Sequence, residues 1–202
     1  MAMIMVSLLC GCSSTTPPAY NGYETVGKDL RRDTDLAREK NAQAIKLLEA
    51  NKFPEAQKLL KEALDADVTF GPAHNNLGKA YYHQNEFYLA AWEFQYASKL
   101  MPDAPEPRNN LGLVLEAVGK MDEAINWYDQ ALQIRPDNPQ FLGNDARARY
   151  RRGDHDDHLR QLLQELVEKD DRPDWSAWAR EQLLRMGPGP ATQPGTTEVG
   201  VR

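Results

Sequence analysis

Two histidines near the C-terminal end have the residue type and spacing that best fit chemistry. His155 and His158 enclose two aspartates, and no other cluster in the sequence holds metal-ligand side chains so close together. Histidines three residues apart share one face of a helix, where their imidazoles could ligate zinc. A zinc site needs a third ligand, and none stands nearby in the sequence. The favoured interpretation is therefore a solvated turn, and an enzyme with a metal at these two histidines is the alternative.

Other catalytic signatures are missing from the sequence. It contains no glycine-rich phosphate loop, no G-x-S-x-G nucleophile elbow and no H-E-x-x-H helix. His74 and His83 have carboxylates and tyrosines near them, as most residues of a charged helical surface do, and nothing indicates a pair of nucleophile and base. We therefore expect no enzymatic activity, no cofactor, no bound metal and no small-molecule substrate.

The charged residues limit which partners the chain could bind. The formal net charge is −6, whereas a nucleic-acid-binding surface needs an excess of basic residues to displace counterions, so we expect no nucleic-acid partner. Four arginines nevertheless form a basic run: Arg147, Arg149, Arg151 and Arg152. The favoured interpretation is a solvated helix face, and the alternative is contact with an acidic partner segment or with anionic head groups.

Residues 1–12 resemble the export signal of a bacterial lipoprotein. A short apolar run ends at Leu9, and Gly11 directly precedes Cys12. This arrangement resembles a lipobox, with leucine three positions before the lipidated cysteine and a small residue one position before it. The resemblance implies that Cys12 carries a lipid that anchors the protein to a membrane. The alternative is an apolar N-terminus without a role.

The residues after Cys12 fit a tether. The segment 13–18 is polar, contains proline and has no helical period, so it cannot bury enough surface to fold. We assign residues 13–36 to a tether and leading segment. Ser13, directly after the cysteine, favours the outer membrane where such a sorting rule operates. The expected location is therefore the bacterial cell envelope, at the outer membrane and facing the periplasm.

A single repeat period runs through the rest of the chain. Leu77-Gly78 recurs as Leu111-Gly112, one period later. Many further residues recur at this same offset: Asn75-Asn76 and Asn109-Asn110, Ala90 and Ala124, Ala97 and Ala131, Pro102 and Pro136, Asp103, Asp137 and Asp171, and Pro105, Pro139 and Pro173. So many matches at a single offset indicate internal repeats.

Each repeat has the pattern of two helices of about 13 residues joined by a short polar turn. Leu77 and Tyr81 share one face of the first helix, and Ala90 and Phe94 share one face of the second. Small residues such as Gly78 allow the two backbones of a pair to approach closely. We expect the recurring aspartates to cap the next helix and the recurring prolines to lie in its first turn.

This spacing resembles the tetratricopeptide repeat (TPR). The two central units carry its signature: Leu77, Gly78, Tyr81, Ala90, Phe94, Ala97 and Pro102, then Leu111, Gly112, Leu115, Ala124, Tyr128, Ala131 and Pro136. An earlier unit keeps Ala44, Leu47, Ala56, Leu60 and Ala63, whereas a later one keeps Ala146 and Leu162 and loses the rest. The resemblance covers about residues 37–172.

The resemblance implies an all-α, right-handed TPR superhelix, which is an α-solenoid of about four helix pairs. The expected TPR domain, residues 37–186, consists of repeats over about 37–70, 71–104, 105–138 and 139–172 and a capping helix over 173–186. That helix contains Trp175 and Trp178, which we expect to lie in the core rather than to dock a partner. Residues 187–202 are expected to form a disordered tail.

In the TPR family the first helices line a concave groove that holds a peptide or a partner helix. Carried over to this chain, the groove would be lined by Asn41, Asn75, Asn76, Lys79, Tyr82, Asn109, Asn110, Glu116, Asn144 and Arg147. Asparagine both donates and accepts, so these side chains could clamp an extended backbone. Alternatively, they only tie adjacent repeats together. The groove lacks the lysines and arginines of the carboxylate clamp in chaperone-binding TPR domains, so we do not expect capture of a chaperone C-terminus.

These features together predict a scaffold for protein or peptide partners. The lipobox-like start, tether and short array resemble the TPR lipoproteins that assist assembly of type IV or Tad/Flp pili and their secretin pores. We therefore expect a lipid-anchored assembly adaptor of that type. The alternatives are an adaptor for peptidoglycan enzymes and a soluble cytoplasmic TPR regulator.

Overall fold

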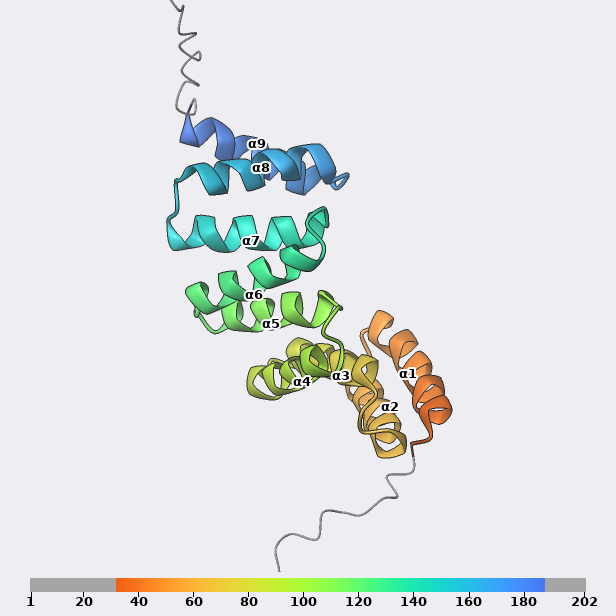
Figure 1. Cartoon of the computed structure of the whole chain (residues 1–202). Helices are drawn as coiled ribbons and strands as arrows, with labels where there is room; N and C mark the ends of the chain where they lie inside the picture. Colours follow the sequence, from red (N-terminus) through yellow and green to blue (C-terminus); the bar gives the residue numbers. More distant parts are fainter. Residues whose placement is uncertain (1–31, 188–202) are drawn as a thin grey trace, which may run out of the picture. The chain divides into compact units, whose positions relative to one another are not determined.

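A computed structural model describes residues 32–187, and this part of the chain is entirely α-helical, without a strand (Figure 1). Its helices are α1 (Thr34–Glu49), α2 (Phe53–Ala66), α3 (Gly71–His83), α4 (Phe87–Leu100), α5 (Glu106–Ala117), α6 (Met121–Ile134), α7 (Pro139–Arg152), α8 (Asp157–Lys169) and α9 (Pro173–Met186). The expected signal, its Cys12, most of the tether and the tail from residue 188 onward lie outside the described residues.

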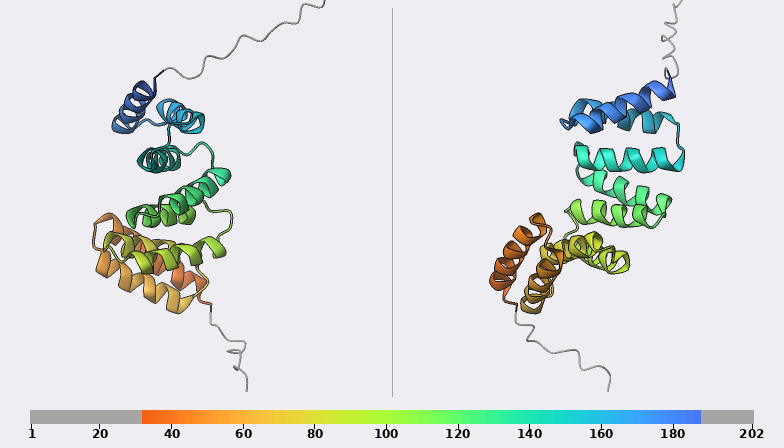
Figure 2. Two further views of the ribbon diagram at one scale, coloured as in Figure 1. Left: turned by 90° about the vertical axis from the view of Figure 1, so that its left-hand side faces the viewer. Right: turned by 180° about the vertical axis from the view of Figure 1, so that it is seen from behind.

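The helices pack in chain order. Each helix contacts the next one along the chain, and α1, α3, α5 and α7 also contact one another in succession. Both views in Figure 2 show this stacking of helix pairs. The first helices of successive pairs therefore lie side by side, and this packing confirms the predicted all-α TPR solenoid. Within residues 32–187, every helix is too short or too polar to span a lipid bilayer.

Small residues allow the helices of a pair to approach closely, as the sequence predicts. An ideal Cβ on Gly78 would lie 2.6 Å from Cε1 of Phe94, the aromatic residue of the second helix. Gly112 has the same relationship to Tyr128 in the next pair. The alanines that recur on the second helices, Ala90 and Ala124 among them, have no exposed surface. Aromatic rings therefore fill the space that the missing side chains leave.

The turns inside the helix pairs share one unusual backbone position. The C-cap of each first helix, or the residue just after it, has a positive φ: Asn51 (56°), Asn85 (60°), Gly119 (80°) and Gly153 (99°). These four positions are separated by the same period as the repeats. Glycine and asparagine are the residues that adopt left-handed backbone most readily, so these turns end the first helices in the same way in every repeat.

The prediction that the recurring aspartates cap the helices is wrong. The side chains that accept a hydrogen bond from the first turn belong to Asp33 in α1, Asn138 in α7 and Asp156 in α8. The recurring aspartate stands at least one residue before the N-cap, too early for its carboxylate to take that place. Asp137, for example, accepts a hydrogen bond from Lys169 Nζ at 2.6 Å. Pro139 and Pro173 begin α7 and α9, as predicted, whereas Pro105 is the N-cap of α5 and lies just before its first turn.

The last helix, α9, packs on α8. Its Trp175 lies over Gly143 of α7, where an ideal Cβ would be 2.9 Å from Trp175 Cε3. Trp175 and Trp178 both pack against the apolar cluster that contains Leu163 and Leu166 of α8. The two rings meet edge to face, with their centroids 5.9 Å apart. Both tryptophans are half-buried. On its other side α9 exposes Leu184, which is 82% accessible.

Candidate partner-binding groove

The asparagines of the first helices form a ladder of hydrogen bonds between successive repeats. In each bond the second asparagine of one repeat donates through Nδ2 to Oδ1 of the first asparagine of the preceding repeat. The three bonds are Asn76 to Asn41 at 2.8 Å, Asn110 to Asn75 at 3.0 Å and Asn144 to Asn109 at 2.8 Å. All of these side chains are buried. The ladder therefore joins α1, α3, α5 and α7 along the side that the first helices share.

The ladder does not exhaust the hydrogen-bonding capacity of these side chains. A primary amide has two donors and two acceptor lone pairs, and each ladder bond uses only one donor and one acceptor. The bonds show that the asparagines tie adjacent repeats together. Binding of a partner by the remaining donors and acceptors stays a prediction.

A buried carboxylate joins the second half of the groove. Glu116 of α5, which is 5% exposed, accepts hydrogen bonds from Arg147 Nε at 3.0 Å and Nη2 at 2.9 Å. Arg151 Nη1, at 2.7 Å, and the Tyr128 hydroxyl, at 2.9 Å, complete the set of donors. Burial alone would raise the pKa of Glu116, but these donors outweigh it and hold the pKa below its ordinary value. Glu116 is therefore a fixed anion between two half-exposed arginines.

The rest of the basic run is paired in a similar way. Arg149 contacts Asp145 at 3.0 Å and Asp129 at 2.7 Å. Arg152 pairs with Asp122 and Asp154. Together with the two arginines at Glu116, every arginine of the run meets a carboxylate of this chain. Glu116 alone compensates only one of the two arginine charges that it binds, and Asp174 lines the pocket beside Arg147.

Lys79 and Tyr82 lie in a pocket of about 220 Å³ that Asn110 and Leu113 also line. Burial lowers the pKa of Lys79, and Glu106 opposes that effect. The Tyr82 ring packs at an angle against Phe87, with ring centroids 5.8 Å apart. The structure therefore brings these two predicted groove residues together with the asparagine ladder.

A second pocket of about 220 Å³ lies where α9 meets α7. It is lined by Arg147, Asp174, Trp175 and Trp178. The guanidinium carbon of Arg147 lies 5.4 Å from the Trp175 ring centroid, and that of Arg172 lies 5.1 Å from it, so two cations hold the ring. From the sequence, both tryptophans are expected in the core. Their half-buried rings in fact also form a wall beside Arg147.

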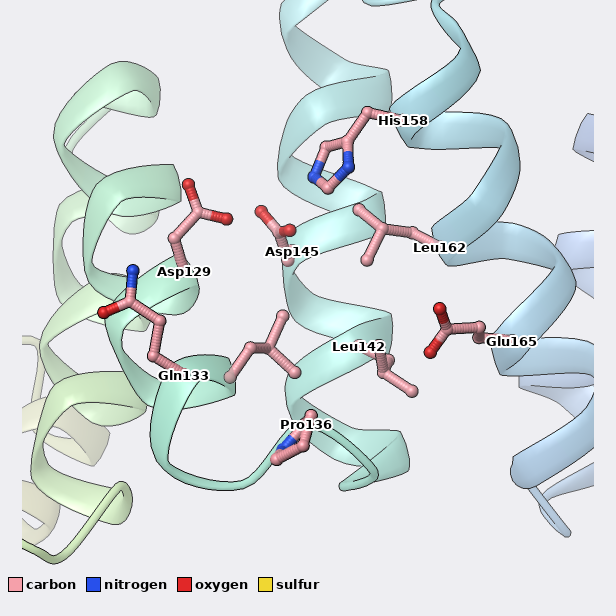
Figure 3. A pocket seen from close by; sticks show the side chains of 9 residues that line it. Asp129, Gln133, Pro136, Leu142, Asp145, His158, Leu162 and Glu165 are labelled. Atoms are coloured by element: carbon pink, nitrogen blue, oxygen red, sulfur yellow. The ribbon is translucent and has the colours of Figure 1, made fainter.

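A larger pocket of about 360 Å³ lies outside the groove, between α6, α7 and α8 (Figure 3). Asp129, Asp145 and His158 point into it, each from a different helix. Burial raises the pKa of Asp145 to about 7, although Arg149 opposes this shift. His155, the other histidine singled out in the sequence, instead contacts the Gly153 carbonyl oxygen through Nδ1 at 2.8 Å. A ring nitrogen of His158 thus lies within 4.8 Å of carboxylate oxygens from two other helices, which the sequence alone did not indicate.

Two family models match the sequence, both described as tetratricopeptide repeat. One covers residues 41–105 and the other residues 105–138. No curated protein matches the sequence.

Solved structures of TPR proteins resemble this fold. PilF of Pseudomonas aeruginosa is 21% identical, with a TM-score of 0.64 over 78% of this chain and 79% of its own. YrrB, described as a TPR protein with an unusual peptide-binding site, is 18% identical, with a TM-score of 0.60 over 74% of this chain and 82% of its own. The first TPR domain of Spaghetti (RPAP3), bound to an HSP90 peptide, is 20% identical, with a TM-score of 0.59 over 62% of this chain and 100% of its own.

Identities this low establish the fold alone, and the family models establish the repeats. The two family models together match residues 41–138. In residues 32–187 the helices before and after this matched part stack in the same way as those within it. The chain therefore carries tetratricopeptide repeats and folds as an all-α TPR solenoid.

Proposed function

We propose that this TPR scaffold holds a peptide or helix of a partner protein in the groove of its first helices, and that it does so as a lipid-anchored assembly adaptor of the bacterial envelope. The observation that carries the binding proposal is that polar and aromatic side chains of the first helices line two pockets. In one pocket Lys79 and Asn110 of the ladder lie beside the Tyr82 ring, and in the other Arg147 lies beside the Trp175 ring. Such a surface offers hydrogen bonds to a backbone and apolar walls to side chains.

The structural neighbours support a protein or peptide as the ligand. The RPAP3 domain is bound to a peptide, and YrrB has a peptide-binding site. This chain differs from a carboxylate clamp, because its groove positions are mostly asparagine. We therefore expect recognition of a backbone along its length rather than capture of a chain end.

The envelope part of the proposal rests on the first residues and on one likeness. Cys12 stands in a lipobox-like context, and the fold resembles that of PilF. By this analogy the chain would assist assembly of a pilus or a secretin pore at the outer membrane. The absence of enzymatic activity remains a prediction that follows from the scaffold role.

The anchor is tested by intact mass and membrane partition of the protein expressed with its native N-terminus, beside a Cys12→Ser variant. We expect the native protein to lose residues 1–11, gain acyl mass and enter the membrane fraction, and the variant to do neither. If both proteins are soluble and begin at Met1, the envelope proposal is wrong and a cytoplasmic adaptor takes its place.

The partner is tested by photo-cross-linking in cells, with the cross-linking residue in place of Tyr82 in the groove. The matched control carries it in place of Tyr88, which is 82% exposed on α4. Adducts with a secretin or pilus component at Tyr82 and not at Tyr88 are the expected result. Adducts with a peptidoglycan enzyme would replace the pilus assignment with the second adaptor role. Equal adducts at both positions would contradict binding in the groove.

A further inference from the structure

Three side chains with metal-ligand atoms converge in the pocket between α6, α7 and α8. They are Asp129, Asp145 and His158, and one possible ligand atom from each lies within 4.8 Å of the other two. Figure 3 shows the imidazole of His158 directed toward the two carboxylates. This set combines an aromatic nitrogen with two carboxylates, the mixture that first-row transition metals accept.

The charges around this cluster favour a bound cation. Asp145 has no exposed surface, and Arg149 is the cation that contacts both it and Asp129. Arg152, the next arginine but one along α7, is bonded to Asp122 and Asp154. Arg149 is one guanidinium that faces two carboxyl groups, so ionisation of both would leave one negative charge uncompensated. A buried carboxylate without full compensation is unfavourable, so a cation at this place would stabilise the fold.

The contacts of Arg149 leave room for further ligation. Its Nε donates to both oxygens of Asp145 at 3.0 Å, and its Nη2 donates to Oδ1 of Asp129 at 2.7 Å. A carboxylate has about four lone-pair positions, so both aspartates keep acceptor capacity. His158 is exposed in the first turn of α8, so few contacts hold its imidazole in place beside the carboxylates.

We propose that Asp129, Asp145 and His158 bind one divalent transition-metal ion, with Zn²⁺ as the reference ion and water as its fourth ligand. Tetrahedral zinc with bonds of about 2.0–2.1 Å places its ligand atoms about 3.3 Å apart. The three groups must therefore move closer than their present separation of up to 4.8 Å. Asp145 is fixed by burial, so the more accessible Asp129 and His158 would move onto the ion.

Such an ion would have a structural consequence. It would join the second helix of the third repeat to both helices of the fourth, where the repeat pattern of the sequence is weakest. Metal binding that involves three helices stabilises the folded state against the unfolded one. This inference is independent of partner binding in the groove, and it departs from the sequence-based expectation of no metal.

The test is a calorimetric titration of the metal-free full chain with ZnCl₂, together with thermal unfolding with and without the ion. Cys10 and Cys12 are replaced by serine so that their thiols do not compete for zinc. We expect one ion per chain and a higher Tm with zinc. His158→Ala and Asp129→Asn should each weaken binding by about tenfold or more.

The matched control is His155→Ala, which removes a neighbouring exposed histidine that lies outside the cluster. It should bind zinc like the parent protein. Circular dichroism of each variant checks that the helices are retained, and Asp129 and His158 are both accessible enough for this to hold. Absence of binding, or an equal loss in His155→Ala and His158→Ala, would overturn the proposal. So would binding that neither His158→Ala nor Asp129→Asn weakens.

Discussion

Asn110 donates a hydrogen bond to Asn75 across the boundary between two repeats, with Nδ2 and Oδ1 3.0 Å apart. The bond joins α5 to α3 in a buried place, so its loss leaves an amide group of the partner without that contact. The same geometry recurs at the two neighbouring boundaries. The ladder is thus a property of the array rather than of any one repeat.

We expect Asn110→Ala to lower the free energy of unfolding by about 1–2 kcal/mol, because it removes a buried hydrogen bond and leaves Asn75 Oδ1 without its donor. A double-mutant cycle with Asn75→Ala, followed by urea denaturation, measures the coupling. The losses in free energy of unfolding of the two single variants should add up to more than the loss of the double variant. Strict additivity would show that the bond contributes nothing to stability and would favour the partner-binding interpretation of these asparagines.

Glu116→Gln is expected to destabilise the fold at pH 7 by about 2 kcal/mol, because hydrogen bonds to a charged acceptor are lost. The folded-state pKa of Glu116 lies below its ordinary value of 4.5, so the carboxylate stabilises the fold above that pH. As the pH falls below about 4.5, the unfolded state takes up the proton first. The difference in stability between parent and variant should therefore shrink in acid, in denaturation curves measured from pH 7 to pH 3. A constant difference would contradict the assignment.

Gly143→Ala should destabilise the C-terminal end by about 1–3 kcal/mol, because the new methyl group would meet the Trp175 ring. In the double variant Gly143→Ala, Trp175→Leu, the new methyl group no longer meets the tryptophan ring. We expect its loss in free energy of unfolding to be smaller than the sum of the losses in the two single variants. Thermal unfolding followed by circular dichroism measures both. Full additivity would mean that the two residues do not pack as described.

Asn85→Ala should cost about 1–2 kcal/mol, because alanine in left-handed backbone brings its Cβ too close to a carbonyl oxygen. Asn85→Gly should be close to neutral, since glycine already takes this place in the next two repeats. Gln84→Ala, one residue earlier and at negative φ, serves as the control. Equal effects of Asn85→Ala and Asn85→Gly in urea denaturation would be inconsistent with a backbone origin.

The helix pairs could be predicted from the sequence because two periods coincide in it. Leu77 and Leu111 mark the period of the repeats, and the helical period places Ala90 and Phe94 on one face within it. Both signals arise from packing that every repeat shares. The left-handed turn position could have been predicted from the repeat period as well. Asn or Gly occupies it at the same place in each repeat from Asn51 onward.

The caps and the ion pairs could not be predicted in this way. The recurring aspartates lie one or two residues before the N-cap, because the repeat offset gives the period of the helices but not the residue at which each helix begins. Glu116 and Arg147 were both placed in the groove, but their bond spans 31 residues and depends on side-chain direction. Asp145 and His158 lie in the fourth unit, which keeps few residues of the repeat signature. The signature therefore does not predict which side chains of its two helices face each other.

The ladder has a direction, and this direction limits how the array can grow. Each bond needs a donor at the second asparagine position and an acceptor at the first. One repeat period beyond Asn144, the next donor position holds Trp178, and the acceptor position facing it holds Gly143, already covered by Trp175. A further repeat copied from the centre of the chain and inserted between α8 and α9 would find no side-chain acceptor for its asparagine at Gly143, and it would displace Trp175 from that glycine. The array would thus lose one ladder bond and one aromatic contact at the same boundary, so the side chains of α7 and α9 favour an end to the ladder at this place.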